Sequence, residues 1–338
     1  MRVDVHAHCY PRFYMKELSK IGAGDEAGVG VKVPVWESAE ERIAEMDRLG
    51  VDVHVLALSA PNVYFSDDEL SKTLAETTND FIADVAKRHP QRFLSLASIP
   101  LTNLDHAMAE LGRALDELKM DGIVLGTNIN NVPLSDDRFF PFFQEIDRRK
   151  IPVALHPMRS IAEDVMPKED YGLGVPTCVG FLFETSRTMA QMTFKGTFER
   201  LPNLTFILPH SGGAIPFICP RWDIFYRSRP EGHRLRNLPN PPSYYLKRHY
   251  YDTALSYHPS TVRCTVDLAG VDHLLFGTDH PYTNDFRAPE TIQSIDEKCG
   301  FTAEEKEKIF FKNAATLFPK LREREFLDCA VLAPTSRT

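Results

Sequence analysis

Two histidines near the N-terminus are separated by a single residue, in the segment His6-Ala7-His8. Side chains alternate between the two faces of a β-strand, so both imidazoles would point to the same side. Two imidazoles held side by side can chelate one metal ion. The pair alone is weak evidence, because histidines at this spacing can equally line a core or face solvent.

The elements that would position these histidines form a repeating pattern. Eight short β-branched or apolar runs are expected to be strands: 2–8, 51–58, 92–99, 122–127, 152–157, 204–210, 250–255 and 274–279. Their continuous apolarity is typical of a parallel sheet covered on both faces. Segments with helical spacing lie between them at 39–49, 68–88, 105–118 and 138–149. Eight such units predict an α/β fold, a (β/α)₈ TIM barrel, rather than a doubly wound sheet.

The domain organisation predicted from this pattern is one barrel over residues 1–320 and a C-terminal tail over 321–338. Residues 303–318 are expected to form the terminal helix. Three intervals are too long for simple connections, and they follow the first, fifth and sixth strands: 9–37, 158–203 and 211–249. Such insertions form lids and pocket walls in barrels. Glycines in 22–30 predict a flexible lid, and the prolines of 211–249 predict loop and short helix there.

Three more metal-capable side chains close later strands of the predicted barrel. His156 ends the fifth strand, His210 the sixth and Asp279 the eighth. Barrel active sites lie at the C-terminal ends of the strands, so these side chains would meet His6 and His8 on one face. The combined pattern predicts a metal site there.

Four motifs in the chain resemble the amidohydrolase superfamily. They are H-A-H at 6–8, H-P at 156–157, H-S-G-G at 210–213 and G-T-D-H-P at 277–281. More narrowly, the chain is similar to the branch that contains 2-amino-3-carboxymuconate-6-semialdehyde decarboxylase and aromatic acid decarboxylases. Supporting matches are W-E-S-A-E-E-R-I-A-E-M-D at 36–47, F-x-x-P-R at 217–221 and Y-D-T-A-L at 251–255.

The resemblance implies roles for individual residues. The metal ligands would be His6, His8, His156 and Asp279, and His210 would be the catalytic acid/base working beside Asp279. The superfamily's second metal usually needs a lysine on the fourth strand, and 122–127 has none, so one ion is expected. Three imidazoles and one carboxylate suit Zn²⁺, with Mn²⁺ as the alternative, and no organic cofactor is required.

Two arginines are candidate substrate-binding residues. From the sequence, Arg42 reads as a surface residue paired with neighbouring glutamates. The resemblance instead implies that Arg42 and Arg221 grip a substrate carboxylate, Arg221 reaching in from a neighbouring subunit, which implies a homodimer. Met158 and His280 stand where the muconate decarboxylase has other residues, so the pocket wall and the substrate are expected to differ.

These observations predict a metal-dependent, non-oxidative decarboxylase of a small unsaturated or aromatic carboxylic acid, in which His210 activates water held on the ion. A hydrolase of a lactone or amide would need the same ligands and the same histidine, and it is the alternative. A non-catalytic barrel is a third possibility, but it predicts a missing ligand or base.

Composition excludes other classes of function. The chain of 338 residues carries 47 acidic and 39 basic side chains, a net charge of −8, so nucleic acid is not an expected partner. No apolar run is long enough to cross a membrane. Six scattered cysteines and the absence of a signal-peptide pattern predict a reducing, cytosolic location. His54 is expected in the core, whereas His89, His106, His233 and His249 are expected at the surface.

Overall fold

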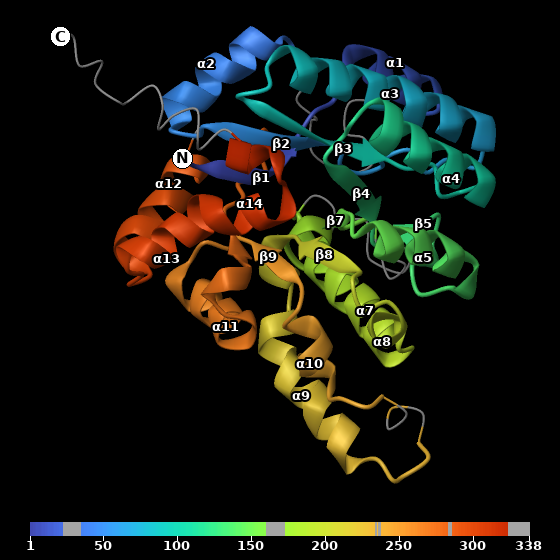
Figure 1. Ribbon diagram of the computed structural model, residues 1–338, viewed down its shortest axis with the longest axis vertical. Coiled ribbons are helices and arrows are strands. Elements are labelled where there is room, and N and C mark those ends of the chain that lie inside the picture. The colour runs from blue at the N-terminus through green and yellow to red at the C-terminus, as the bar shows by residue number, and fades with distance from the viewer. Residues whose placement is uncertain (23–34, 160–172, 234, 236–237, 283–285, 324–338) are drawn as a thin grey trace, which may run out of the picture.

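Eight parallel strands form one sheet in a computed structural model that describes residues 1–22, 35–159, 173–233, 235, 238–282 and 286–323 (Figure 1). In their order around the sheet they are β1 (Val3–His8), β2 (Val53–Ala57), β3 (Phe93–Ser98), β4 (Gly122–Gly126), β7 (Pro152–His156), β8 (Thr205–Leu208), β9 (Tyr250–Asp252) and β10 (Leu274–Leu275). A short antiparallel pair, β5 (Asn128–Ile129) and β6 (Val132–Pro133), follows β4. The eight strands correspond one for one to the predicted runs.

Backbone hydrogen bonds join the last strand to the first. Val5 N donates to Phe276 O at 3.0 Å, and Asp279 N donates to His6 O at 2.9 Å. A parallel bridge between Ala7 and His280 continues this pairing beyond β10. The sheet therefore closes into the predicted (β/α)₈ barrel.

Helices surround the barrel between successive strands (Figure 1). They are α1 (Arg12–Lys20), α2 (Ala39–Leu49), α3 (Asp68–Arg88), α4 (Leu104–Gly112), α5 (Phe140–Arg149), α7 (Phe181–Phe194), α8 (Thr197–Arg200), α9 (Ile215–Ser228), α10 (Pro242–Leu246), α11 (Pro259–Ala269), α12 (Arg287–Gln293), α13 (Ala303–Glu307) and α14 (Asn313–Leu317). Side-chain caps fix the starts of several of them. Ser38 accepts a hydrogen bond from Glu41 N at the start of α2, and Asp67 accepts two at the start of α3.

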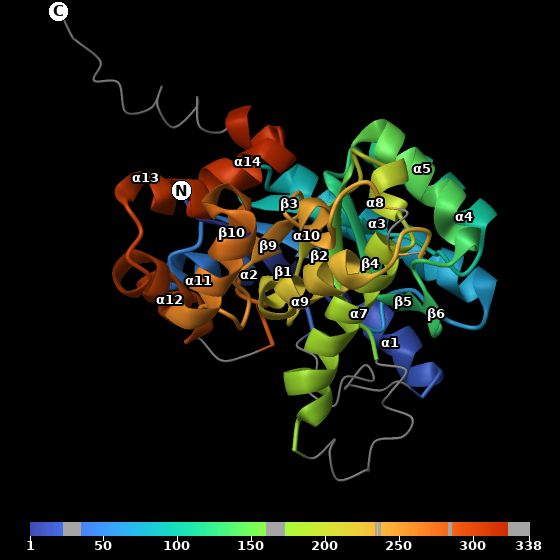
Figure 2. The same ribbon diagram turned by 90° about the horizontal axis from the view of Figure 1, so that it is seen from below.

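The core has two layers, one inside the barrel and one between the strands and the surrounding helices. Inside the barrel, valine, leucine and isoleucine side chains of the strands pack together, among them Val3, Val5 and Val55. Phe311 and Phe318 belong to this inner cluster, so the terminal helical segment closes the end at which the strands begin. Figure 2 shows α14 on the opposite side of the barrel from α1 and α7, which belong to insertions after strand ends. One end of the barrel is thus closed by packing, and the other is free for a site.

Two sequence expectations need correction here. Residues 211–249 contain the 14-residue helix α9, with Pro220 inside it, instead of only loop and short helix. Burial of Ile215 and Cys219 stabilises this helix although a proline removes one of its hydrogen bonds. His249, expected at the surface, is 1% exposed between Phe198 and Phe206.

Other expectations have different outcomes. His54 is buried in β2, as predicted. Most of the glycine-rich segment 22–30 and of the tail 321–338 lies outside the described residues. The boundary at 320 stays a prediction. Among the helices that the structure describes, none is long and apolar enough to cross a membrane.

Candidate metal centre

A bulge in β1 aims the first two candidate ligands. The register between β1 and β2 shifts between Asp4 and Ala7, so β1 gains one residue over its partner at this point. Val5 consequently belongs to the inner core, while His6 and His8 both reach the open end of the barrel. A bulge beside a site is a common way to redirect a side chain.

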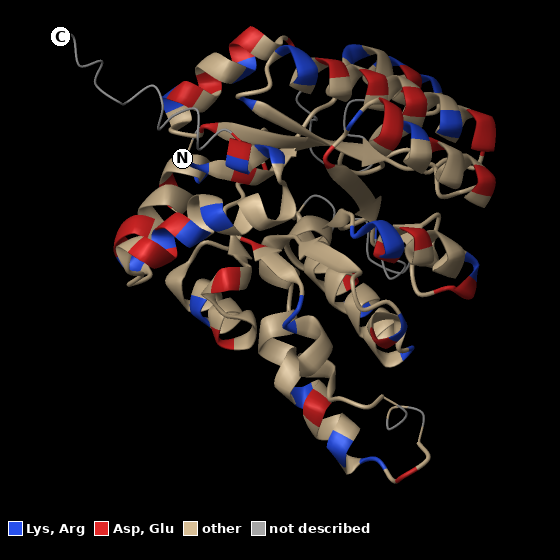
Figure 3. Ribbon diagram, viewed as in Figure 1, with Lys and Arg blue, Asp and Glu red and all other residues tan. Residues whose placement is uncertain are grey.

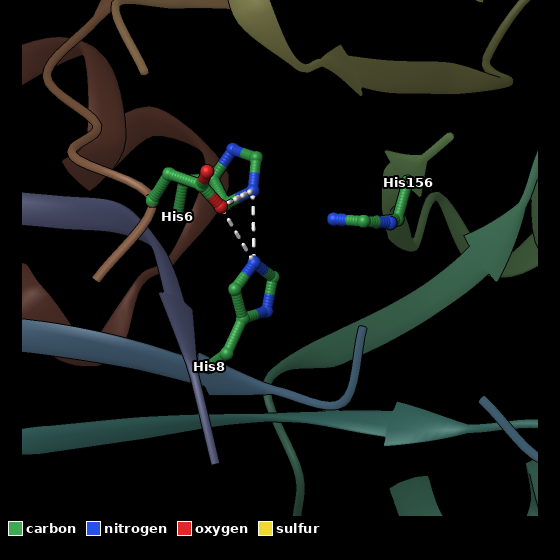
Figure 4. Close-up of side chains that lie close together, drawn as sticks. His6, His8 and His156 are labelled. Carbon is green, nitrogen blue, oxygen red and sulfur yellow. Dashed lines mark hydrogen bonds and ion pairs between the residues drawn. The ribbon is translucent and has the colours of Figure 1, made fainter. Parts of the chain in front are cut away.

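Four side chains at the strand ends converge: His6, His8, His156 and Asp279 each offer one ligand atom, and these atoms lie within 4.8 Å of one another (Figure 4). His6 Nε2 is 3.1 Å from His8 Nε2. Asp279 Oδ1 is 3.3 Å from the first and 3.1 Å from the second of these nitrogens. Tetrahedral ligands at zinc distances stand about 3.3 Å apart, so these three atoms already have the spacing of a metal shell.

Asp252, at the end of β9, orients His6. Its Oδ2 lies 2.8 Å from His6 Nδ1, so that nitrogen carries the proton and donates it to the carboxylate. The Nε2 lone pair is then directed at the other ligands. Burial disfavours the charged imidazolium, but Asp252 and Asp279 outweigh burial and raise the pKa of His6. An ion entering the site must therefore compete with a proton.

His156, at the end of β7, has its tautomer set in a similar way. Its Nδ1 lies 2.9 Å from the carbonyl oxygen of Pro157, which can only accept, so Nδ1 is the protonated nitrogen. Nε2 therefore keeps its lone pair, and it contacts Ser59 Oγ at 2.9 Å. Burial holds the pKa of His156 well below its usual value, which keeps the ring neutral, as a metal ligand must be.

Asp279 follows β10 and supplies the one carboxylate among the four ligands. Burial opposes its ionisation, but hydrogen bonds from His6 and His8 hold its pKa well below the usual range. Its second oxygen, Oδ2, lies 3.3 Å from Nη1 of Arg287. The backbone of Asp279 has a φ of 65°, a left-handed conformation that few non-glycine residues adopt and that is often found at functional sites.

His210 lies two residues after the end of β8, in a turn that has the same left-handed backbone conformation. Its φ is 54°, and the next three residues of the H-S-G-G motif also have positive φ. Gly213 is required there, because a Cβ at this position would lie 2.4 Å from Leu182 O. The His210 backbone N–H donates to Asp252 Oδ1 at 2.9 Å, so one aspartate positions both His6 and His210.

The imidazole of His210 is neutral at physiological pH. Burial lowers its pKa to about 4. Its Nδ1 is buried and has no hydrogen-bond partner among the described residues. A neutral imidazole beside a metal centre can accept a proton and later donate it again.

A cavity of about 380 Å³ opens over the centre. Its lining combines polar groups with an apolar wall, and the lining residues are Ser59, His156, Thr177, Cys178, Phe181, Leu182, His210, Leu255, Ser256, Asp279, Tyr282 and Arg287. This size and composition are typical of a site for a small organic molecule.

The four predicted substrate-binding residues are not among those that line this cavity. Arg42 is buried beneath β1, where it donates to His8 O and lies over the ring of Trp36. Its surface reading is wrong, since its side chain is 7% exposed. Met158 packs on Gly126, whose missing Cβ leaves room for it. His280 contacts Glu45 at 3.1 Å. Arg221 is exposed on α9, over the ring of Phe225.

Comparison with known proteins places this barrel in a family. The sequence model of the amidohydrolase family matches residues 3–320, nearly the whole chain. The chain belongs to the amidohydrolase family. Within it, the chain is 30% identical to the 2-amino-3-carboxymuconate-6-semialdehyde decarboxylase of Dictyostelium discoideum, over 93% of this chain and 90% of that protein.

Two further amidohydrolase-family relatives are decarboxylases of aromatic acids. The gamma-resorcylate decarboxylase of Rhodococcus jostii is 27% identical, over 87% of this chain and 93% of the relative. The solved structure of 5-carboxyvanillate decarboxylase from Sphingomonas paucimobilis superposes with a TM-score of 0.81 at 25% identity, covering 94% of this chain and 98% of that one. The family assignment and the barrel predicted from the sequence are therefore confirmed.

Sequence reasoning missed three residues of this centre. Asp252 lies within the quoted Y-D-T-A-L motif, which is the signal that could have found it. The predicted strand ran on to residue 255, whereas β9 ends at Asp252. Ser59 and Arg287 lie in loop and helix-start positions with no motif around them. Nothing in their local sequence separates them from other serines and arginines.

Proposed function

We propose that this chain is a metal-dependent, non-oxidative decarboxylase of a small aromatic or unsaturated carboxylic acid. One observation carries the proposal: three imidazoles and one carboxylate converge at the floor of a cavity that has an apolar wall and a guanidinium. The relatives named above, all decarboxylases, support the same reaction. The four ligands would hold one divalent ion, which supplies Lewis-acid stabilisation of the negative charge that develops as the C–C bond breaks.

A side chain of the protein would then supply the proton that replaces CO₂ on the substrate carbon. Loss of CO₂ leaves an electron pair on the substrate carbon, and a proton must replace the carboxylate to give R–H. His210 faces the cavity and is neutral at pH 7, so it can take up a proton and deliver it to that carbon. Phe181, Leu182 and Leu255 give the cavity an apolar wall, and an apolar surrounding favours release of neutral CO₂ from a carboxylate that has lost its water.

Zinc is the proposed ion, with manganese as the alternative. Imidazole-rich shells with one carboxylate suit Zn²⁺, and the ligand atoms of His6, His8 and Asp279 lie 3.1–3.3 Å apart, close to the spacing in a tetrahedral zinc shell. Elemental analysis of protein purified without chelators tests this assignment, and a stoichiometry near one zinc per chain is expected. Stoichiometric manganese in place of zinc would overturn it.

The decisive test of the reaction is a CO₂ assay. Metal-loaded protein is incubated with a panel of hydroxybenzoic and enoic acids, and with lactones and amides of similar size. CO₂ release from at least one acid is expected, and chelation should abolish it. Hydrolysis of an ester, lactone or amide with no CO₂ from any acid would replace the proposal by its alternative, a hydrolase that uses the same ligands.

We also propose a homodimer formed through α7 and α9. Apolar side chains are exposed on both helices, and Phe217, at 82% exposure, is the extreme case. A groove of about 480 Å³ lies between the helices and is lined by Phe183, Ile218 and Trp222 among others; it shares Cys178 and Leu182 with the cavity over the metal centre. Figure 3 shows few charged residues on α7 compared with α2 and α3. Exposed apolar surface of this kind favours association.

Sedimentation velocity tests the dimer. The unmodified protein should sediment as a dimer, and Phe217→Glu should shift it to the monomer. Met108→Glu, at an exposed apolar residue on α4, is the control and should stay dimeric. A monomeric unmodified protein would contradict the proposal. The prediction that Arg221 of a partner subunit binds the substrate depends on this dimer. The cytosolic location also stays a prediction.

A further inference from the structure

The cavity above the metal centre holds one guanidinium, that of Arg287, whose role in the proposed reaction has not yet been assigned. Arg287, the first residue of α12, lines the cavity together with His210, Asp279 and Tyr282. Its side chain is 18% exposed. Among the described residues that line this cavity, no other lysine or arginine occurs. A permanent positive charge is therefore fixed within the same small space as the metal ligands.

Most of the hydrogen-bonding capacity of Arg287 is free. A guanidinium has five N–H donors in a rigid fork. In the described part of the chain, the Arg287 side chain makes one hydrogen bond, from Nη1 to Asp279 Oδ2, and at 3.3 Å it is long for a charge-assisted contact. The other oxygen, Asp279 Oδ1, faces His6 and His8. Arg287 therefore contacts the Asp279 oxygen that faces away from His6 and His8, and its other N–H donors stay available to a ligand.

A carboxylate that enters this cavity needs such a partner. Moving an ionised acid out of water is costly unless a charged or hydrogen-bonding group meets it. Phe181, Leu182 and Leu255 offer nothing to an anion. A guanidinium can bind both oxygens of a carboxylate at once and so fix the plane of the group as well as its place.

We infer that Arg287 binds the carboxylate of the substrate and aims it at the open side of the metal centre. This inference rests on the proposed function, since it takes the substrate to be an acid. It assigns the role of carboxylate anchor to a residue of the same subunit, at the start of α12. Arg42, buried beneath β1, would not then be needed for it.

A matched pair of probes separates this role from simple support of Asp279. 2-Hydroxybenzoate and 2-hydroxybenzamide have the same ring and hydroxyl, but only the first carries a carboxylate. Their dissociation constants are measured on metal-loaded protein by calorimetry, and metal content is measured on the same samples. The variants are Arg287→Met and Arg287→Lys. Arg149→Met is the control. Arg149 lies on the outer helix α5, is similarly shielded from solvent, and forms ion pairs with Asp116 and Glu145.

Arg287→Met should raise the dissociation constant of 2-hydroxybenzoate about 10- to 100-fold, which is the range expected when a charge-assisted hydrogen-bonded pair is lost. Binding of 2-hydroxybenzamide and the metal content should stay within about threefold of the unmodified protein. Arg287→Lys should restore part of the loss, and Arg149→Met should change nothing. Equal weakening of both probes, or loss of metal in Arg287→Met, would show that Arg287 only supports Asp279 and would overturn the inference.

The same samples keep this inference distinct from the proposed function. If 2-hydroxybenzoate binding depends on Arg287 but no acid releases CO₂ from the unmodified protein, the anchor stands and the decarboxylase proposal fails. If CO₂ is released normally and Arg287→Met binds 2-hydroxybenzoate like the unmodified protein, the anchor is refuted while the reaction stands.

Discussion

Asp252 connects the candidate metal ligands to His210, the proposed proton-transfer group. One of its oxygens accepts from His6 Nδ1, and the other accepts from the backbone of His210. The first contact sets the tautomer of a ligand, and the second places the catalytic candidate. A single carboxylate behind the centre thus coordinates two functions that the sequence places on different strands.

Asp252→Asn should weaken metal binding about 10- to 100-fold, because the amide is a poorer acceptor for His6 Nδ1–H and leaves its tautomer unfixed. Competition with a chromogenic chelator measures the affinity. Asp267→Asn, at an exposed position on α11, is the matched control and should bind metal normally. Unchanged affinity in Asp252→Asn would show that His6 is oriented without this contact.

His210 and Asp279 should respond differently to replacement. His210→Gln should retain the metal and lose turnover about 10²- to 10⁴-fold, since it removes proton transfer and not a ligand. Asp279→Ala should lose the metal together with activity, because it removes the carboxylate ligand. Elemental analysis beside CO₂ assays measures both effects. Equal metal loss in the two variants would mean that His210 is itself a ligand.

At the scale of elements, the segment that leads from α10 into β9 carries a buried histidine with a structural role. His249 packs between Phe198 and Phe206, and its Nδ1 accepts from Phe206 N. Burial lowers its pKa to about 3, so the folded protein keeps the ring neutral. The unfolded chain binds a proton below about pH 6.5, which favours unfolding in acid.

The contribution of His249 to stability is fully present above about pH 6.5 and is lost as the pH falls toward 3. Between pH 7 and pH 5 the loss should be about 2 kcal/mol of unfolding free energy. His249→Gln lacks a titrating ring, so its stability should fall less over this interval, although its starting value is lower. Denaturant titrations at both pH values test this, with exposed His233→Gln as control. The prediction fails if all three proteins show the same pH dependence.

At the scale of the whole molecule, the metal ligands join the two ends of the barrel sheet. His6 and His8 lie on the first strand and Asp279 follows the last, so an ion held between them bridges the seam at which the barrel closes. An ion that binds only the folded state stabilises it by mass action. Metal binding should therefore be coupled to the integrity of the whole barrel.

Chelation should lower the melting temperature of the unmodified protein, and readdition of zinc should restore it. At a free zinc concentration about 1,000 times the dissociation constant, the stabilisation is about 4 kcal/mol. Differential scanning calorimetry measures the shift. Asp279→Ala is the reference and should be insensitive to chelator. A chelator effect of equal size in this variant would place the stabilising ion elsewhere.

The sequence by itself determined the barrel, the strands and the convergence of His6, His8, His156, His210 and Asp279 toward one end. This was possible because strand periodicity and the common direction of parallel strands are local rules, and each of these residues lies at or near the C-terminal end of a predicted strand.

Only the tertiary structure decided which other side chains meet the centre. Asp252 and Arg287 contact the metal-site residues. Arg42 is instead buried beneath β1, and His249, which was expected at the surface, is buried in the core. Local sequence could not settle these cases, because membership of a cavity depends on how helices and loops pack around the barrel. Neighbouring residues in the chain do not encode that packing by themselves.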